Sequence, residues 1–132
     1  MKYALDTNTL IYFFKGQGRV PENLLATAPS DILIPTIVVY ELETGIAKSS
    51  EPQKREQQLS ELLDVITVVP LDREAARQAA GIRARLEQQG IPIGPMDTLI
   101  AATALAHNAT LVTHNTSEFQ RVADLPLTDW FT

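Results

Sequence analysis

Residues 2–9 of the chain read KYALDTNT. The run 2–6 is short and apolar and ends in Asp6, a pattern typical of a β-strand that leads to the edge of a sheet. A helix is expected to begin near Leu10, immediately after this run. Three residues can cap that helix: Thr7, Asn8 and Thr9. The stretch therefore predicts a strand followed directly by a helix, with a carboxylate at the junction.

The same alternation of apolar runs and helical patterns continues along the chain. Further strands are expected at 32–34, 67–71 and 109–113, with a short strand or turn closing the chain near 126–130. Five helices are expected: a short one within 16–29, one capped by Thr36 and running through Ile46, one with its apolar face at Leu59, Leu62 and Leu63, one from Asp72 to Gly90, and one over 97–107. Loops are expected at 48–57 and 90–95. This order predicts an α/β three-layer sandwich, with a mostly parallel central sheet and helices on both faces.

Composition limits the domain organisation and the compartment. A chain of 132 residues with 45% hydrophobic residues can bury one ordinary core, so we expect a single domain over 1–132. There is no cysteine, and therefore no disulfide framework or thiolate metal site. Asp6 and Asn8 would interrupt the apolar part of a signal peptide, and no apolar run approaches the roughly 18 residues that span a bilayer. We expect a cytoplasmic protein without a membrane segment.

Three acids occupy positions that a parallel sheet brings together. Ligands of such sheets bind outside the carboxyl ends of the strands, near a switch in strand order. Asp6 and the segment 113–115 fall at strand ends, whereas Glu41 and Asp97 fall in early helical turns. We expect all of them to converge at one edge of the sheet.

Each acid has a simpler interpretation when it is considered alone. Asp6 could cap a helix, Glu41 could be a partly exposed helical glutamate, and Asp97 could complement the dipole at a helix start. Three clustered carboxylates, however, repel one another unless a cation neutralises them. The cluster therefore predicts a site for Mg²⁺ or Mn²⁺. Zinc is disfavoured, because cysteine is absent and His107 and His114 lack a paired ligand spacing.

The net charge of −5 disfavours broad, non-specific adhesion to nucleic acid. Carboxylates that hold a metal ion contribute to this charge, and bound metal cancels it locally. A basic partner could do the same.

Four stretches of the sequence carry a resemblance to a known family. They are 5–8 (LDTN), 36–42 (TIVVYEL) with Gly45, 94–101 (GPMDTLIA), and 112–115 (VTHN) continuing to Glu118 and Phe119. In this order and spacing, the chain resembles the VapC-type toxins of the PIN-domain superfamily over essentially its whole length.

The resemblance implies a metal-dependent endoribonuclease that is paired with a VapB antitoxin, often forms a homodimer, and cleaves RNA such as tRNA. It transfers the family's three acids to Asp6, Glu41 and Asp97, with Asp6 and Asp97 as direct metal ligands. Many family members have a fourth acid after the last strand, where this chain has Asn115, with Glu118 three residues later. The resemblance leaves open which of the two replaces the fourth acid. We predict Asn115 as a catalytic residue with the three acids, and Glu118 as a supporting residue or RNA contact.

Several polar residues near these acids can support the site. Thr7, Asn8, Thr113 and Asn115 suit contacts to ligands or to phosphate, although capping and turn formation explain each of them equally well. His114 could contact RNA or could simply be solvated. His107 closes a helix, which is a sufficient structural explanation for it.

Three other functions are alternatives to the nuclease. Residues 6–9 partly imitate the DxDxT loop of haloacid dehalogenase-like phosphatases, but Asn8 removes the second acid and no lysine follows Lys54. A receiver module fails because it lacks an acidic pair and a late lysine. A non-catalytic interaction module would use the acids only as caps.

The alanine-rich segments 75–80 and 101–106 allow two interpretations. They could form a homodimer interface that brings Arg83 and Arg85 alongside RNA, or they could pack inside the chain against the sheet.

Overall fold

The computed structural model describes the whole chain, residues 1–132. One sheet of five strands has the order β3-β2-β1-β4-β5, and every pairing in it is parallel. The strands are β1 (Tyr3–Leu5), β2 (Ile32–Pro35), β3 (Thr67–Val69), β4 (Thr110–Val112) and β5 (Leu127–Thr128). The prediction of a mostly parallel sheet is confirmed.

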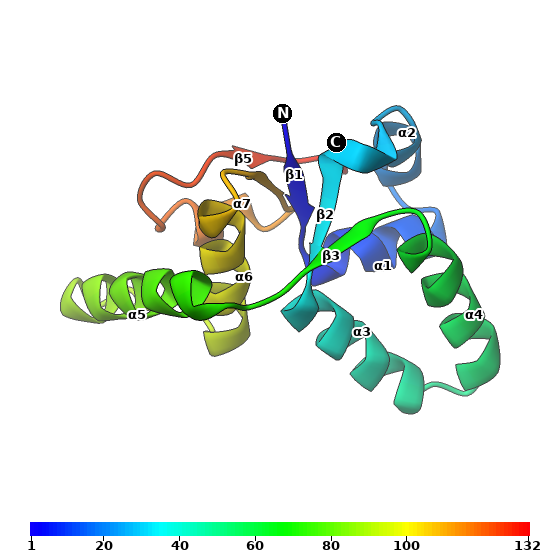
Figure 1. The fold of residues 1–132 in the computed structure, drawn as a ribbon, viewed down its shortest axis with the longest axis horizontal. Coiled ribbons are helices and arrows are strands. Elements are labelled where there is room, and N and C mark those ends of the chain that lie inside the picture. The colour runs from blue at the N-terminus through cyan, green and yellow to red at the C-terminus, as the bar shows by residue number, and fades with distance from the viewer.

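Seven helices connect and cover these strands. They are α1 (Thr7–Lys15), α2 (Val20–Leu25), α3 (Thr36–Ala47), α4 (Pro52–Leu63), α5 (Arg73–Gln88), α6 (Pro95–Ala106) and α7 (Thr116–Phe119), and a 3₁₀ turn occupies Pro29–Asp31. Parallel strands require right-handed crossovers, so the connections on the two sides of β1 lie on opposite faces. Figure 1 shows the first four helices to one side of the strands and α5 to α7 to the other. The expected three-layer sandwich is confirmed.

One part of the core lies between the central strands and the helix α6, and another lies under α1 to α4 on the opposite face. Leu5, Ile34 and Leu111 are completely buried on β1, β2 and β4. Four consecutive residues of α6, 101–104, are also buried, and α6 contacts both β2 and β4. Small side chains on α6 let this helix approach the sheet closely.

The alanine-rich segments therefore serve mainly internal packing. Ala101, Ala102 and Ala104 are buried within one chain, so the expectation that this segment could form a dimer surface is wrong for α6. On α5, Ala75 and Ala79 are buried in the same way, whereas Ala76 and Ala80 are exposed, so a dimer surface on α5 stays a prediction. No helix of the structure combines the length and the apolar character that crossing a bilayer requires.

Two helix starts differ from the predictions. The N-cap of α1 is Asp6, and not Thr7, Asn8 or Thr9, because helical backbone begins at Thr7. Thr36 is the first residue of α3 rather than its cap, and its hydroxyl donates to the carbonyl of Val69 at 2.9 Å. That bond ties the start of α3 to the end of β3.

Three further boundaries complete the comparison with the sequence. Asp72 caps α5 as predicted, accepting a hydrogen bond from the Ala75 amide at 2.9 Å. The segment 48–57 is not wholly a loop, since α4 begins at Pro52. Proline at the first helical position is a common start signal. The short helix α7 was not predicted.

Candidate active site

The edge formed by the carboxyl ends of β1 and β4 carries the candidate site. In the sheet, β2 and β3 lie on one side of β1, whereas β4 and β5 lie on its other side. The strand order therefore reverses between β1 and β4. A crevice at such a reversal is the usual ligand site of an open parallel sheet. Asp6 directly follows β1, and Thr113 directly follows β4.

Asp6 is held rigidly at this edge. Its side chain accepts a hydrogen bond from the Thr9 amide at 2.9 Å, and its backbone amide donates to Val112 on β4 at 3.2 Å. The residue is only 5% exposed. Burial raises the pKa of Asp6, the neighbouring side chains of Thr113 and Thr9 lower it, and the charge of Glu41 raises it further. Helix capping and membership of an acidic cluster thus coexist in this residue.

Glu41 reaches the same edge from the second turn of α3. The hydroxyl of Thr7 donates to Glu41 Oε1 at 2.6 Å, which joins the first residue of α1 to α3. Glu41 is half-buried, whereas Glu43, two residues later, is exposed. Thr7 therefore orients the carboxylate of Glu41 toward the site of Asp6.

Asp97, in the first turn of α6, has a carboxylate with a strongly raised pKa. Its pKa is raised from 3.8 to about 6, first by burial and then by the charges of Glu118, Glu41 and Asp6. Every charge that affects it is negative. The structure therefore brings four carboxylates into mutual electrostatic range, with no cation of the chain among them.

Glu118 is the fourth of these acids, and Asn115 holds it in place. The side-chain amide of Asn115 donates to Glu118 Oε2 at 2.6 Å, and the backbone amide of Gly94 donates to Glu118 Oε1 at 3.4 Å. Sequence reasoning had named Asn115 among the catalytic residues and Glu118 only as a supporting contact. The geometry places the carboxylate beside Asp97 and gives Asn115 a positioning contact. The signal was their spacing of three residues, which one helical turn spans.

The remaining polar residues have different surroundings. Asn8 is exposed, and its side chain makes no hydrogen bond within the chain. Thr113 is fully buried, and its hydroxyl accepts from the Asn115 amide at 3.0 Å. His114 bonds to Asp129, which the sequence did not point to as a neighbour.

The four acids match a hard divalent cation in ligand type and in charge. Mg²⁺ and Mn²⁺ prefer carboxylate oxygens, and such a cation would offset the repulsion that raises the pKa of Asp97. As they stand, however, no three acidic or histidine side chains are spaced to hold one metal ion.

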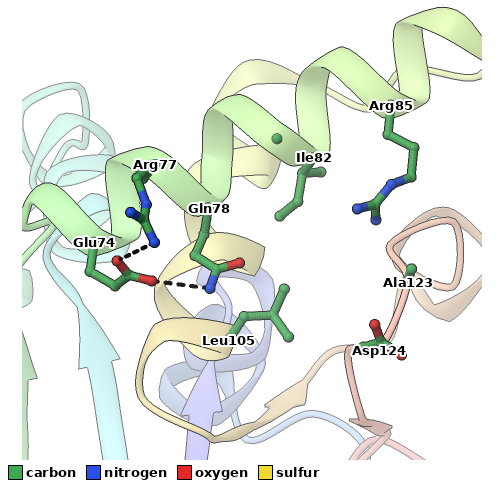
Figure 2. Close-up of a pocket in the computed structure, with 9 residues that line it drawn as sticks. Glu74, Arg77, Gln78, Ile82, Arg85, Leu105, Ala123 and Asp124 are labelled. Carbon is green, nitrogen blue, oxygen red and sulfur yellow. Dashed lines mark hydrogen bonds and ion pairs between the residues drawn. The ribbon is translucent and has the colours of Figure 1, made fainter.

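A groove of about 350 Å³ adjoins the site between α1, α3 and α4. Glu41 contributes to its lining, together with apolar side chains such as Ile11, Phe14, Leu42 and Leu59. A second depression, of about 370 Å³, lies between α5, the end of α6 and the turn at Asp124. Figure 2 shows that Arg85 points into this second depression, and none of the four acids lines it.

Family comparison agrees with this geometry. Residues 3–125 match the model of the PIN domain. Ribonuclease VapC2 of Rickettsia felis is 36% identical over 132 residues, which cover 98% of each chain. The chain belongs to the VapC branch of the PIN-domain family. A relative from Shigella flexneri, named tRNA(fMet)-specific endonuclease VapC, is 33% identical to this PIN domain and has the same coverage.

Solved structures show the same fold. VapBC2 of Rickettsia felis, bound to a DNA fragment from its promoter, superposes on this PIN domain with a TM-score of 0.91 at 36% identity, covering 98% of this chain and 99% of that one. DNA-bound VapBC from Salmonella typhimurium gives 0.92 at 32% identity, with 98% of both chains covered.

Proposed function

We propose that this PIN domain is the endoribonuclease toxin of a toxin–antitoxin pair and hydrolyses phosphodiester bonds in RNA. The observation that carries the proposal is the pKa of Asp97, raised first by burial and then by the charges of three other carboxylates at the strand-order switch of the sheet. Relatives named ribonucleases, similar over nearly their whole length, support the same reaction. Neither a haloacid dehalogenase-like phosphatase nor a non-catalytic module has comparable support.

Asp6, Asp97 and Glu41 would hold Mg²⁺ or Mn²⁺, with Glu118 as the fourth acid. A divalent cation bound there supplies charge for the phosphodiester oxygens and eases deprotonation of water. The chain contributes orientation, since the Thr9 amide fixes Asp6, Thr7 fixes Glu41, and Asn115 fixes Glu118. The attacking group is water, so no side chain becomes covalently attached to RNA.

The substrate class is RNA, and tRNA is the first candidate to test. Two relatives, from Shigella flexneri and Salmonella typhimurium, carry the name tRNA(fMet)-specific endonuclease. Arg83 is paired with Glu87 at 3.1 Å, whereas Arg85 has no ion-pair partner and could meet a phosphate. A homodimer would bring two acidic sites to one substrate, but α6 offers no exposed alanine surface for it.

The partner would be a VapB antitoxin, because similar structures are VapBC complexes. The groove between α1, α3 and α4 is lined by apolar side chains together with polar ones, among them Glu41, Lys15 and Arg55. An antitoxin segment with apolar side chains and one arginine fits this chemistry, since an arginine at the acids would take the place of a cation. The net charge of −5 also favours a basic partner. We further propose that the pair acts in the cytoplasm.

The test is cleavage of total RNA and of purified tRNA by the isolated chain in Mg²⁺, in Mn²⁺ and in EDTA. The proposal predicts defined fragments with either cation and none in EDTA. An interaction module would leave the RNA intact under all three conditions.

A further inference from the structure

His114 lies in the sequence between Thr113 and Asn115, which both contact the acidic site. Its side chain is half-exposed but is held by several contacts. Its Nδ1 contacts Asp129 Oδ2 at 2.8 Å, and 39% of its side chain is exposed. The ring of Phe131 stacks on it, with centroids 4.3 Å apart and planes 25° apart. A solvated histidine would have neither constraint. The interpretation of His114 as a simply solvated residue is therefore wrong.

Asp129 holds both rings of this stack. Its Oδ2 bonds to His114, while its Oδ1 accepts from the backbone amide of Phe131 at 2.8 Å. Tyr12 of α1 completes the cluster edge-on, with its ring 6.0 Å from that of His114 and 4.8 Å from that of Phe131. Gly18 leaves the space for Phe131, because a Cβ on Gly18 would lie 2.7 Å from that ring. The chain thus builds the stack from three separate segments.

The stack sits at the same edge of the sheet as the acids. Val112 of β4 pairs with Thr128 of β5, so His114 and Asp129 both follow the carboxyl ends of neighbouring parallel strands. The residue before His114 is Thr113, whose side chain lowers the pKa of Asp6. The stack therefore flanks the place where the proposed function puts the scissile phosphate.

The chemistry of the exposed imidazole edge suits a nucleotide. A carboxylate can only accept hydrogen bonds, so Nδ1 of His114 carries the proton that it shares with Asp129. Nε2 then has no hydrogen-bond partner within the chain, and 39% of the side chain that carries it is exposed. A neutral imidazole in this tautomer accepts a hydrogen bond at Nε2, and its ring can stack on a base. Single-stranded RNA is recognised by this combination of stacking and polar contact at base edges or at the 2′-hydroxyl.

We propose that His114 is a specificity-determining contact for RNA. A base that flanks the scissile phosphate stacks on the imidazole ring and extends the Phe131–His114 stack. Nε2 of His114 accepts a hydrogen bond from the edge of that base or from a ribose 2′-hydroxyl. The inference rests on the proposed ribonuclease function. RNA is favoured over the antitoxin because the groove that suits an antitoxin lies between α1, α3 and α4, and neither His114 nor Phe131 lines it. Asp129 is a positioning residue, since it acts through His114.

The test is steady-state cleavage of purified tRNA by His114→Ala, His114→Phe and Asp129→Asn. Loss of one stacked base predicts that His114→Ala raises KM about tenfold, with kcat changed less than about twofold. His114→Phe keeps a planar ring and should recover most of that KM. It should lose the discrimination that Nε2 supplies at the flanking position, either between bases or between a ribose and a 2′-deoxyribose. Asp129→Asn should raise KM less than His114→Ala does. Gln120→Ala, an exposed change outside the stack, is the control.

The other outcomes separate the two proposals. Cleavage with an unchanged KM in His114→Ala overturns the RNA contact and leaves the ribonuclease intact. A fall in kcat alone overturns it as well, because His114 would then act on the acids. If His114→Ala weakens binding of the antitoxin and leaves KM for RNA unchanged, the contact belongs to the protein partner. Absence of cleavage by the unaltered chain overturns both proposals.

Discussion

Asn115 donates its side-chain amide to Oε2 of Glu118 at 2.6 Å, directly beside Asp97. The two residues therefore have different roles. Glu118 supplies the carboxylate, and Asn115 orients it. Glu118→Gln should therefore lower kcat/KM for RNA roughly tenfold to a hundredfold, the usual effect of losing an oriented ligand group. Asn115→Ala should lower it less.

If Asn115 acts only through Glu118, the double variant should be no slower than Glu118→Gln alone, because the two changes remove the same interaction. Kinetic measurement of the four proteins on one tRNA decides this. Losses that add independently would show that Asn115 has a separate role.

The raised pKa of Asp97 predicts how the stability of the metal-free chain depends on pH. The folded protein binds the Asp97 proton more tightly than the unfolded chain, with a pKa of about 6 against 3.8. This contribution to stability is complete below the unfolded value and is lost as pH rises through about 6. Asp97→Asn should thus gain stability relative to the unaltered protein between pH 4.5 and 7.5, by about 1 kcal/mol after allowance for solvent screening.

Urea unfolding in EDTA at both pH values measures this effect. Asp64→Asn, an exposed acid at the end of α4, should show no such pH-dependent gain. A stability difference between Asp97→Asn and the unaltered protein that is constant with pH would contradict the assignment.

The hydrogen bond from Thr7 to Glu41 predicts a kinetic effect without unfolding. Thr7→Val removes the hydroxyl that donates at 2.6 Å and keeps the shape of the side chain. We expect kcat/KM to fall about tenfold, while the free energy of unfolding changes by about 1 kcal/mol. The matched control is Thr44→Val, which removes a hydroxyl that donates to the Tyr40 carbonyl on the exposed face of α3. It should leave cleavage unchanged. Equal activity of the two variants would remove Thr7 from the site.

Two glycines with the same backbone conformation allow the cost of backbone strain to be distinguished from the cost of a steric clash. Gly16 and Gly18 have φ of 68° and 60°, but only Gly18 faces a neighbour within 3 Å, the ring of Phe131. Gly16→Ala should cost about 1 kcal/mol, the penalty for a left-handed alanine, and Gly18→Ala at least about 1 kcal/mol more, because the ring must move. Thermal or urea unfolding measures both. Equal costs would mean that Phe131 is not packed as described.

Much of the sheet, and the position of three of the acids at its edge, could be predicted from the sequence. Short apolar runs ending in polar residues identified the strands, and the parallel arrangement then brought Asp6, Glu41 and Asp97 to one edge. Asp72 was predictable as a cap because an acid before a helical pattern has few other uses. These inferences depend on local patterns that the fold does not override.

The remainder depends on contacts that are distant in sequence or lack a pattern. Helix α7 spans only one turn, too short for a helical period, so the spacing of Asn115 and Glu118 does not by itself show which of the two joins the cluster. Asp129 meets His114 across 15 residues through the pairing of β4 with β5. The polar segment before Leu59 predicts a loop because only one face of α4 is apolar, and proline at position 52 is the only local sign that the helix begins earlier.

The most direct test of the four-acid site is the rate of tRNA cleavage as a function of Mg²⁺ concentration for the unaltered chain, Asp97→Asn and Asp64→Asn, each shown by circular dichroism to be folded. The account predicts cleavage that rises with Mg²⁺ and disappears in EDTA for the unaltered chain and for Asp64→Asn. Asp97→Asn should be at least about a hundredfold slower at every concentration, because it lacks a charged ligand group. Cleavage by Asp97→Asn at the unaltered rate, or cleavage that persists in EDTA, would contradict it.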